Sequence, residues 1–224
     1  MKLPRSLFEH KLQHRKNWRV LQYVPLMFLI VFCANAVDAG EGIISFEAES
    51  VSLSPGWKLQ SGIEGFSGSG YLQWVADDTR ETGQGLLIYP FEISKSGVYQ
   101  LNVRCHQGGA AWDAANDMFV QIPTANSIDG YPDIKAPLKA YVGSEFDYRM
   151  SREERMTTRQ SLTDNWRWWL WGEEVRSVFR FYLHAGSHEL LISGRSKGFI
   201  IDKIVIFPTG TVDFEQQPPE AFFK

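Results

Sequence analysis

Short runs of alternating apolar and polar residues, separated by turn signals, constrain the fold of this 224-residue chain most strongly. Side chains of an extended strand point alternately to its two faces, so each run fits a strand with one buried face. These runs are residues 71–75, 86–93, 98–104, 118–122, 178–183, 189–192 and 199–207. No long stretch follows the helical period. The pattern predicts an all-β fold, a β-sandwich or jelly roll.

Two short turns and one long polar stretch connect the predicted strands. Ser94–Gly97 and His184–His188 each separate two runs at a distance typical of a β-hairpin. Residues 123–165 form a long polar insertion, which fits either a functional lid or rim, or a plain cover for a sandwich edge. The sequence therefore predicts one β-sandwich domain, residues 40–208, followed by a tail, residues 209–224.

Residues 1–39 differ in composition from the rest. A basic start precedes an apolar run, Val20–Ala36. The small residues Ala34 and Ala36 resemble a signal-peptidase site, and Val37–Ala39 offers a second possible cleavage site. An uncleaved membrane anchor is the alternative, but the run is slightly short for a span and contains polar residues. The segment predicts a secreted protein, extracellular or periplasmic, whose mature form has no membrane span.

Removal of this segment makes the chain acidic. Six of the 23 Lys and Arg residues and two of the 26 Asp and Glu residues lie in it, which leaves 17 basic and 24 acidic side chains, a net charge near −7. Phosphate contacts from Lys and Arg supply most nucleic-acid affinity, so a nucleic-acid partner is not expected. Cys105 is the only cysteine left, so no intrachain disulfide can form and a metal is the expected staple.

Three carboxylates at the two ends of this domain suggest such a metal. Glu47 and Glu49 share one face of the first predicted strand, and alternation places Asp202 on the same face as Ile204 and Ile206. Burying a lone carboxylate costs several kcal/mol, so Asp202 should meet a cation. Oxygen ligands from two strands suit calcium. The alternative is that the glutamates are solvated and Asp202 makes hydrogen bonds at a strand end.

Four tryptophans lie close together in the segment 165–172: Trp166, Trp168, Trp169 and Trp171. Alternation sends Trp166 and Trp168 to one side and the other pair to the opposite side. One pair can pack in the core while the other lines a cleft. An aromatic face beside polar groups suits the flat C–H patch of a sugar ring, although tryptophan in a β-sandwich commonly belongs to the core.

Five short sequence motifs follow one another along the chain: Phe46–Glu49, Gly65–Leu72, the strand that begins at Ser96, Leu183–Leu190 and Ile201–Val205. Together they resemble family 35 and family 6 carbohydrate-binding modules, which are galactose-binding-like jelly rolls. The closing stretch is also similar to the C-terminal domain of family 115 glycoside hydrolases, where a Trp-x-Trp precedes an Ala-Gly turn. The resemblance covers nearly the whole mature chain.

The resemblance implies a jelly roll with a structural calcium ion. The implied side-chain ligands are Glu47, Glu49 and Asp202, with backbone oxygens added by the turn Gly65–Gly70. It also implies that an aromatic residue before the Ala-Gly turn stacks on sugar, a role that falls here on the pair Trp166 and Trp168.

The chain departs from the family 6 pattern just before its last strand. Many such modules carry an asparagine there, whereas this chain has Arg195 and Lys197. Arg and Lys recognise carboxylate and sulfate, so the change favours acidic sugars such as uronates, or it is an ordinary charged turn. Asn116 and Asp117 add polar groups or cap a strand. The candidate ligand-binding residues are Trp166, Trp168, Asn116, Asp117, Arg195 and Lys197.

These features predict a non-catalytic carbohydrate-binding protein. Its expected partners are a polysaccharide or oligosaccharide and a separate carbohydrate-active enzyme. The alternatives are a glycoside hydrolase or other carbohydrate-active enzyme component, and a surface-adhesion or protein-interaction domain. His184 and His188 have metal-like spacing but straddle a tight turn, and nothing fixes the separation of Asp113 and Asp117 as a catalytic pair. The sequence lacks a nucleophile elbow, a phosphate loop and a zinc signature.

Overall fold

The computed structural model describes residues 37–38, 42–108, 114–141, 165–168, 171–172 and 177–210, and all of them belong to one of the two units into which the chain divides, residues 33–224. The described part is all-β: it contains thirteen strands, a single 3-10 turn at Ala48–Ser50 and no α-helix. A helix long and apolar enough to cross a membrane does not occur in it. Most of the proposed signal and of the tail lies outside these ranges.

The strands, in chain order, are β1 (Val37–Asp38), β2 (Ile44–Glu47), β3 (Trp57–Gln60), β4 (Tyr71–Trp74), β5 (Leu87–Ile93), β6 (Gly97–His106), β7 (Asp117–Gln121), β8 (Leu138–Tyr141), β9 (Arg167–Trp168), β10 (Trp171–Gly172), β11 (Ser177–Leu183), β12 (Gly186–Gly194) and β13 (Ile200–Pro208). Every predicted run coincides with a strand. The predicted strand with Glu47 and Glu49 ends at Glu47, and Glu49 lies in the 3-10 turn, so the prediction that both glutamates share one strand face was wrong. Five short strands were not predicted: β1, β3, β8, β9 and β10. The strand β8 lies inside the polar insertion, whose residues 142–164 fall outside the described ranges.

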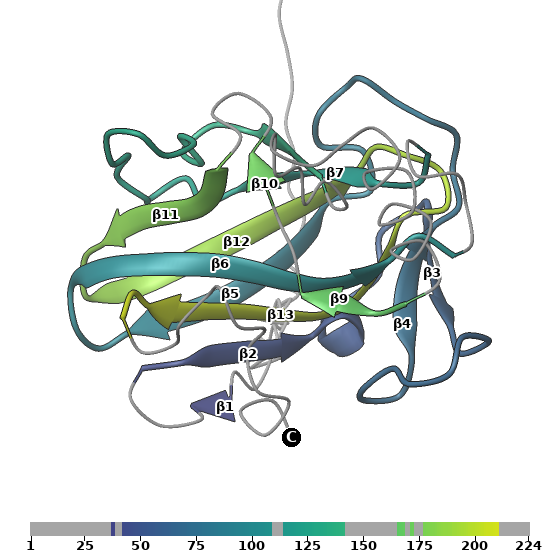
Figure 1. Ribbon diagram of the computed structural model, residues 1–224, viewed down its shortest axis with the longest axis horizontal. Coiled ribbons are helices and arrows are strands. Elements are labelled where there is room, and N and C mark those ends of the chain that lie inside the picture. Colours follow the sequence, from purple (N-terminus) through teal and green to yellow (C-terminus); the bar gives the residue numbers. More distant parts are fainter. Residues whose placement is uncertain are drawn as a thin grey trace, which may run out of the picture. The chain divides into compact units, whose positions relative to one another are not determined.

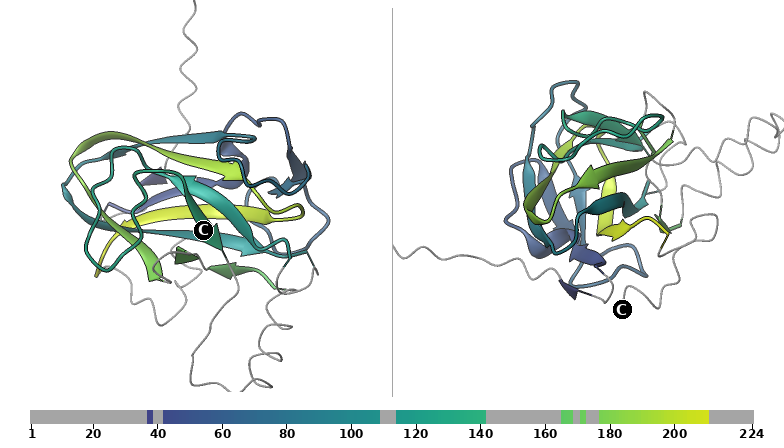
Figure 2. Two further views of the ribbon diagram at one scale, coloured as in Figure 1. Left: turned by 90° about the horizontal axis from the view of Figure 1, so that it is seen from above. Right: turned by 90° about the vertical axis from the view of Figure 1, so that its left-hand side faces the viewer.

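All strand pairs are antiparallel and follow the path β1-β2-β13-β6-β11-β10-β8-β7-β12-β5, with β4 attached to β13, β3 to β4 and β9 to β6. The path folds over, so that β2, β13, β6 and β11 lie in one layer and β8, β7, β12 and β5 in the other (Figures 1 and 2). The short strand β10 pairs with both β11 and β8 and joins the layers. This arrangement is consistent with the expected β-sandwich.

The two turns predicted as hairpins do not join paired strands, so that part of the prediction was wrong. Ser94–Gly97 leads from β5, which pairs with β12, to β6, which pairs with β13 and β11. His184–His188 likewise leads from β11 to β12, which pair with different neighbours. Each turn carries the chain from one layer to the other. Turn length alone does not reveal this, because a crossing turn can be as short as a hairpin.

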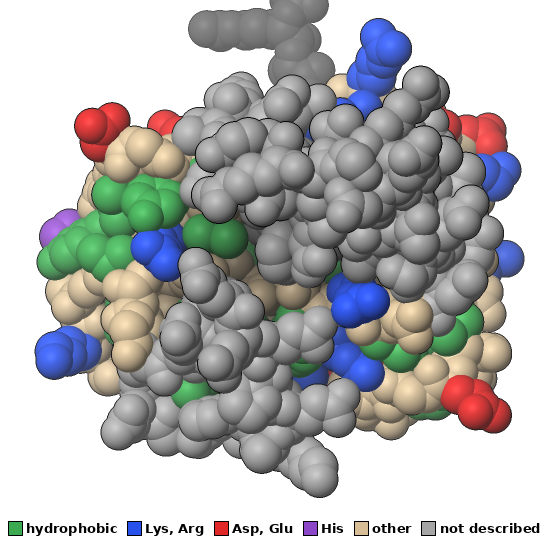
Figure 3. Space-filling model, in the orientation of Figure 1, with side chains coloured by type: hydrophobic (Ala, Val, Ile, Leu, Met, Phe, Trp, Pro, Cys, Tyr) green, Lys and Arg blue, Asp and Glu red, His purple; other side chains and the backbone are tan. Residues whose placement is uncertain are grey.

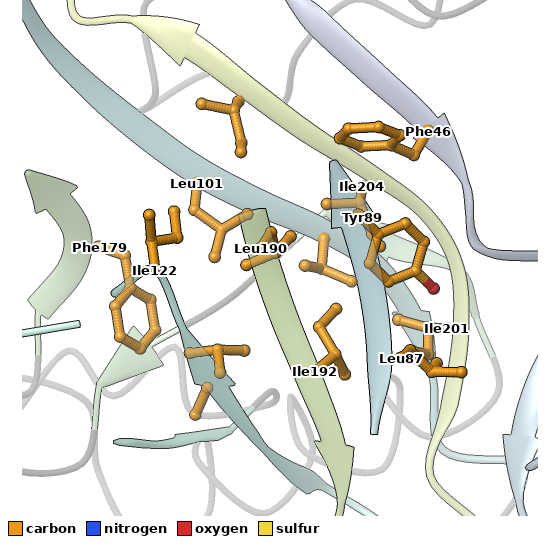
Figure 4. Close-up of a cluster of buried hydrophobic side chains, with 14 of the residues drawn as sticks. Phe46, Leu87, Tyr89, Leu101, Ile122, Phe179, Leu190, Ile192, Ile201 and Ile204 are labelled. Atoms are coloured by element: carbon orange, nitrogen blue, oxygen red, sulfur yellow. The ribbon is translucent and has the colours of Figure 1, made fainter. Parts of the chain in front are cut away.

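The hydrophobic core fills the space between the layers. Along β5 every second residue is buried, namely Leu87, Tyr89, Phe91 and Ile93. Their side chains meet those of β6, β11, β12 and β13, as Figure 4 shows for Tyr89, Leu101, Phe179, Leu190 and Ile204. Burial of each such side chain contributes roughly 1.5–3 kcal/mol to folding. The core thereby holds β2 and β13 in fixed positions.

The last strand contains an irregularity at Asp202. The partners on β6 shift between Ile201, which lies opposite Cys105, and Lys203, which lies opposite Arg104. Ile201 and Ile204 both reach the core although they are three residues apart, which strict alternation forbids. A β-bulge of this kind inserts one unpaired residue and re-aims a side chain. The prediction that Asp202 simply shares a face with Ile204 was therefore wrong.

Candidate functional site

Three carboxylates meet at the turn Gly65–Gly70, and we call Glu47, Glu49 and Asp202 the carboxylate cluster. The pairing of β2 with β13 places Lys203 opposite Glu47 and brings residues from the two ends of the domain together. The Ser67 amide donates to Asp202 Oδ1 over 2.8 Å, and its hydroxyl lies 2.5 Å from Glu47 Oε2 and 3.2 Å from Asp202 Oδ2. The amide and hydroxyl of Ser69 donate to Glu49 Oε1 at 2.6 and 3.0 Å. One turn thus binds all three carboxylates.

Gly68 allows this close approach. Its φ of +64° lies in the left-handed region that glycine adopts at little cost. A Cβ atom at this position would lie 2.4 Å from Glu49 Oε1 and 3.2 Å from Glu47 Oε2. The glycine is therefore required both by the backbone and by the space beside the carboxylates.

Two cations of the chain neutralise part of the cluster. Arg104 Nη1 lies 2.5 Å from Asp202 Oδ2, and Lys203 Nζ lies 2.8 Å from Glu47 Oε1. The Asp202 side chain is fully buried, and this burial raises the pKa of its carboxyl, while the Arg104 and Ser67 hydrogen bonds act in the opposite direction. The prediction that Asp202 meets a cation is confirmed. Its partner is Arg104, a residue that the sequence analysis did not single out.

The fit of this cluster to calcium depends on Glu49. Its Oε2 atom is buried and has no hydrogen-bond partner, whereas both other carboxylates have cationic partners. The three carboxylates, Arg104 and Lys203 together carry one net negative charge. Across the described ranges no set of three His, Cys, Asp or Glu side chains is arranged as a ready metal group. The feature of the cluster that would suit a cation is the Glu49 end, where an acceptor-only oxygen is left unsatisfied.

Trp166 is attached to the same cluster. Its indole N–H donates to the Glu64 carbonyl over 2.8 Å, and its ring meets Tyr71 and His106 edge-on at 5.5 and 5.2 Å between centroids. The Arg104 guanidinium lies 5.1 Å from the ring centroid, a cation–π contact. The ring is partly exposed, so Trp166 both packs on the cluster and reaches the surface.

Trp168 does not share this exposure. It is 6% exposed and packs with Ile43, Val205 and Phe207 in a small second apolar cluster. It lies opposite Arg104 in the β9–β6 pairing. The structure therefore gives no support to Trp168 as an exposed sugar platform. Trp169 and the Trp171 side chain lie outside the described part of the molecule.

Two other candidate residues, Asp117 and Arg195, pair with each other. The Asp117 carboxylate is buried at the start of β7 and accepts short hydrogen bonds from Arg195 Nη1 and the Ser196 hydroxyl. Lys139 Nζ lies 3.5 Å from the same carboxylate. The Arg195 guanidinium also lies 6.0 Å from the Phe119 ring centroid. The pair joins β7 to the β12–β13 turn.

Lys197 is also paired. Its Nζ lies 2.9 Å from Asp77 Oδ1, and its backbone amide donates to Asp78 Oδ1 over 2.6 Å. The Asp77 hydrogen bond, helped by the charges of Asp77 and Asp78, raises the pKa of Lys197. The positive charges expected to favour an acidic sugar at this turn are thus both balanced by carboxylates. Asn116 is partly exposed beside Asp117.

The candidate residues adjoin one end of the sandwich, where β6 ends and β13 begins. His106, which contacts Trp166, lies opposite Ile200. The β12–β13 turn contacts the loop before β7, since a Cβ on Gly198 would lie 3.2 Å from the Ala115 Cβ. These contacts place Trp166, Asn116, Asp117, Arg195 and Lys197 near this end. Trp112 and Asp113 lie outside the described residues.

The histidine spacing has a structural explanation. His188 is buried, with its Nδ1 2.7 Å from the Thr124 hydroxyl and its Nε2 2.8 Å from the His184 carbonyl oxygen. The ring also stacks on Phe91. Both ring nitrogens are therefore engaged, and His184 and His188 do not form a metal pair.

Comparison with known proteins finds similar structures but no similar sequences. No protein-family model and no curated protein matches the chain. A GH26-CBM35 β-(1,4)-mannanase from Podospora anserina has a TM-score of 0.47 at 16% identity, over 80% of this chain and 29% of that one. A family 35 carbohydrate-binding module from Clostridium thermocellum has a TM-score of 0.47 at 16% identity, over 75% and 98%.

A carbohydrate-binding module, CBM6cm-2, of Cellvibrio mixtus lichenase 5A in complex with cellotriose has a TM-score of 0.45 at 16% identity, over 74% of this chain and 96% of the module. The chain therefore spans less than a third of the mannanase structure but nearly the full length of the two isolated modules. The solved structures include both families that the sequence motifs resemble.

Proposed function

We propose that this chain is a non-catalytic jelly-roll module that binds a polysaccharide or oligosaccharide. One observation supports this most directly: the motif pieces Phe46–Glu49, Gly65–Leu72 and Ile201–Val205, far apart in the sequence, meet at the carboxylate cluster. Chance matches to a family pattern would have no reason to contact one another. The binding function is the one that the resemblance of these pieces implies.

The proposed sugar-binding surface is the end of the sandwich around Trp166. A sugar ring presents a flat C–H patch to an aromatic ring and hydroxyl groups to polar side chains. Trp166 offers part of its ring, and Asn116, Arg195 and Lys197 stand at the same end with polar groups. Trp168 is left out of this surface because its ring is buried.

We also propose that the carboxylate cluster holds a structural calcium ion. Glu47, Glu49 and Asp202 would supply side-chain oxygens, and the unsatisfied Glu49 Oε2 supports the assignment. When bound, the ion would add positive charge where the cluster lacks it and would join β2 to β13. The chain itself orients the carboxylates through the Ser67 and Ser69 donors.

Export through the signal segment, residues 1–39, remains part of the proposal, as does a separate carbohydrate-active enzyme as partner. The strand β1 bears on the cleavage position, because Val37 and Asp38 pair with Ser45 and Ile44. Cleavage after Ala36 would keep β1, whereas cleavage after Ala39 would remove it.

The absence of catalysis is a proposal as well. Glycoside hydrolysis commonly requires two carboxyl groups that flank the scissile bond. Asp117, the candidate within the described ranges, is instead buried and accepts hydrogen bonds from Arg195 and Ser196. This environment suits a structural carboxylate.

A polysaccharide array probed with the full protein tests the proposal. We expect binding to a defined polysaccharide without release of reducing sugar. Trp166→Ala should remove this binding, whereas Leu59→Ala, a change of an exposed residue on β3, should leave it unchanged. Hydrolysis of the bound polymer would favour the enzyme alternative. No binding to any polysaccharide on a broad array would contradict the proposed function.

A further inference from the structure

Arg180 is a partly buried basic residue that is held in place by uncharged side chains. It lies on β11, partly buried, with its Nε donating to Gln100 Oε1 over 2.9 Å and its Nη1 donating to the Tyr131 hydroxyl over 2.9 Å. Its guanidinium carbon lies 5.3 Å from the Tyr131 ring centroid. Gln100 is itself 1% exposed, so the guanidinium is anchored from the interior. Both anchoring partners are uncharged.

Arg180 differs from four other basic side chains in having no carboxylate partner among the described residues. Arg104, Lys203, Arg195 and Lys197 each lie within 4.0 Å of a carboxylate oxygen. Within the described ranges no carboxylate pairs with Arg180, and its Nη2 donates to no protein acceptor. Arg180 therefore keeps an uncompensated positive charge and free N–H donors in a partly desolvated position. Such a site attracts an anion.

Aromatic side chains flank this guanidinium. Tyr182 lies two residues further along β11, on the same face as Arg180, and is partly exposed. Its ring meets His184 edge-on at 5.1 Å between centroids. Backbone hydrogen bonds of 2.9 and 3.0 Å between Asn126 and Tyr182 hold the loop that carries Tyr131 against β11. Over β11, Figure 3 shows hydrophobic side chains, a class that includes tyrosine, next to basic and histidine side chains.

This position is separate from the Trp166 end of the sandwich. Arg180 lies opposite Gln100 near the start of β6, whereas Trp166 contacts His106 at its end. Six residues of extended strand separate the two positions by roughly 20 Å. The two positions are therefore distinct.

We propose that Arg180, Tyr131 and Tyr182 bind a carboxylate-bearing sugar, a uronic acid residue of an acidic polysaccharide. The inference rests on the proposed carbohydrate-binding function and assigns its acidic specificity to Arg180 instead of Arg195 and Lys197. The planar guanidinium presents N–H donors in a fork that matches a carboxylate. The tyrosine rings accept the C–H face of the same sugar and contribute hydroxyl groups to its polar edge.

Calorimetric titration of the full protein with polygalacturonate, and with the same polymer methyl-esterified, tests this assignment. We expect tighter binding of the free acid. Arg180→Gln should weaken polygalacturonate binding about tenfold to hundredfold, the loss expected for charge-assisted hydrogen bonds, and leave binding of the ester unchanged. Lys95→Gln is the matched control, because it removes one positive charge at an exposed position and should change neither affinity.

Each remaining outcome decides between the proposals. Unchanged polygalacturonate binding by Arg180→Gln, or binding of neutral polymers alone, overturns the Arg180 assignment while the module function stands. Tighter binding of a sulfated galactan than of polygalacturonate overturns the proposal that Arg180 recognises a carboxylate. Failure to bind any of these polymers or a broad polysaccharide array contradicts the proposed function itself. If Arg180→Gln does not fold, Tyr182→Ala replaces it in the test. The proposal then requires that Tyr182→Ala lose affinity for polygalacturonate while its melting curve stays unchanged.

Discussion

At the scale of single residues, Arg104 connects more parts of the candidate site than any residue identified from sequence. Its guanidinium contacts the buried Asp202 carboxylate, the Gly65 carbonyl at 2.8 Å and the Trp166 ring. It therefore links the last strand, the turn before β4 and the start of β9. A lysine could supply the charge but not the planar group that reaches all three.

Removal of this side chain should be costly. Arg104→Met leaves Asp202 buried without its cation, and breaking a buried ion pair in this way costs about 3–5 kcal/mol. Urea unfolding of the variant would measure the loss. Addition of Asp202→Asn should recover part of it, because the buried charge is then gone. If the double variant is no more stable than Arg104→Met, the ion pair is not the source of the effect.

Trp166 and Trp168 should behave differently although they are two residues apart. Trp168→Ala removes a buried ring and should cost about 3–5 kcal/mol of unfolding free energy. Trp166→Ala should cost less, because the ring is partly exposed, but should abolish polysaccharide binding. Thermal melting and affinity electrophoresis separate the two effects. Equal destabilisation with unchanged binding in both variants would contradict the platform role of Trp166.

At the scale of elements, the strands were predictable and their partners were not. Alternation of apolar and polar residues is a local pattern, so the sequence alone predicts a half-buried strand at Leu87–Ile93. Pairing depends on which layer a turn leads to, and Ser94–Gly97 has the same length in either case. The unpredicted strands have two to four residues, too few for a pattern. The bulge at Asp202 is set by the neighbouring strand, so it leaves no local signal.

The turn at Gly68 gives a prediction at this scale. Gly68→Ala places a methyl group against Glu49 Oε1 and strains a residue with a φ of +64°. Gly130→Ala is the matched control, because Gly130 has a φ of +81° and no atom within 4 Å of the added Cβ. Backbone strain of about 1–2 kcal/mol should appear in both variants. Gly68→Ala should unfold more readily than the control, and equal stability in chemical denaturation would show that the cluster tolerates the intrusion.

At the scale of the whole molecule, β2 and β13 close the domain through the carboxylate cluster. The three carboxylates could be named from the sequence because they belong to the pieces Phe46–Glu49 and Ile201–Val205, which resemble carbohydrate-binding modules. The sequence did not indicate their internal cations, since Arg104 is 98 positions from Asp202. For the same reason the pairing of Asp117 with Arg195, 78 positions apart, was not foreseen. Contacts of this range become visible only when the layers are assembled.

The closure of the domain should depend on calcium. Chelation with EDTA is expected to lower the melting temperature, and readdition of calcium should restore it, because an ion that binds only the folded chain stabilises that state. At 100-fold saturation the contribution is about 2.7 kcal/mol. Glu49→Gln should largely remove this response, since Glu49 carries the unsatisfied Oε2 atom, while Lys197→Gln, on an exposed ion pair, should retain it. A melting curve that EDTA and calcium both leave unchanged would mean that Arg104 and Lys203 hold the cluster together without a metal.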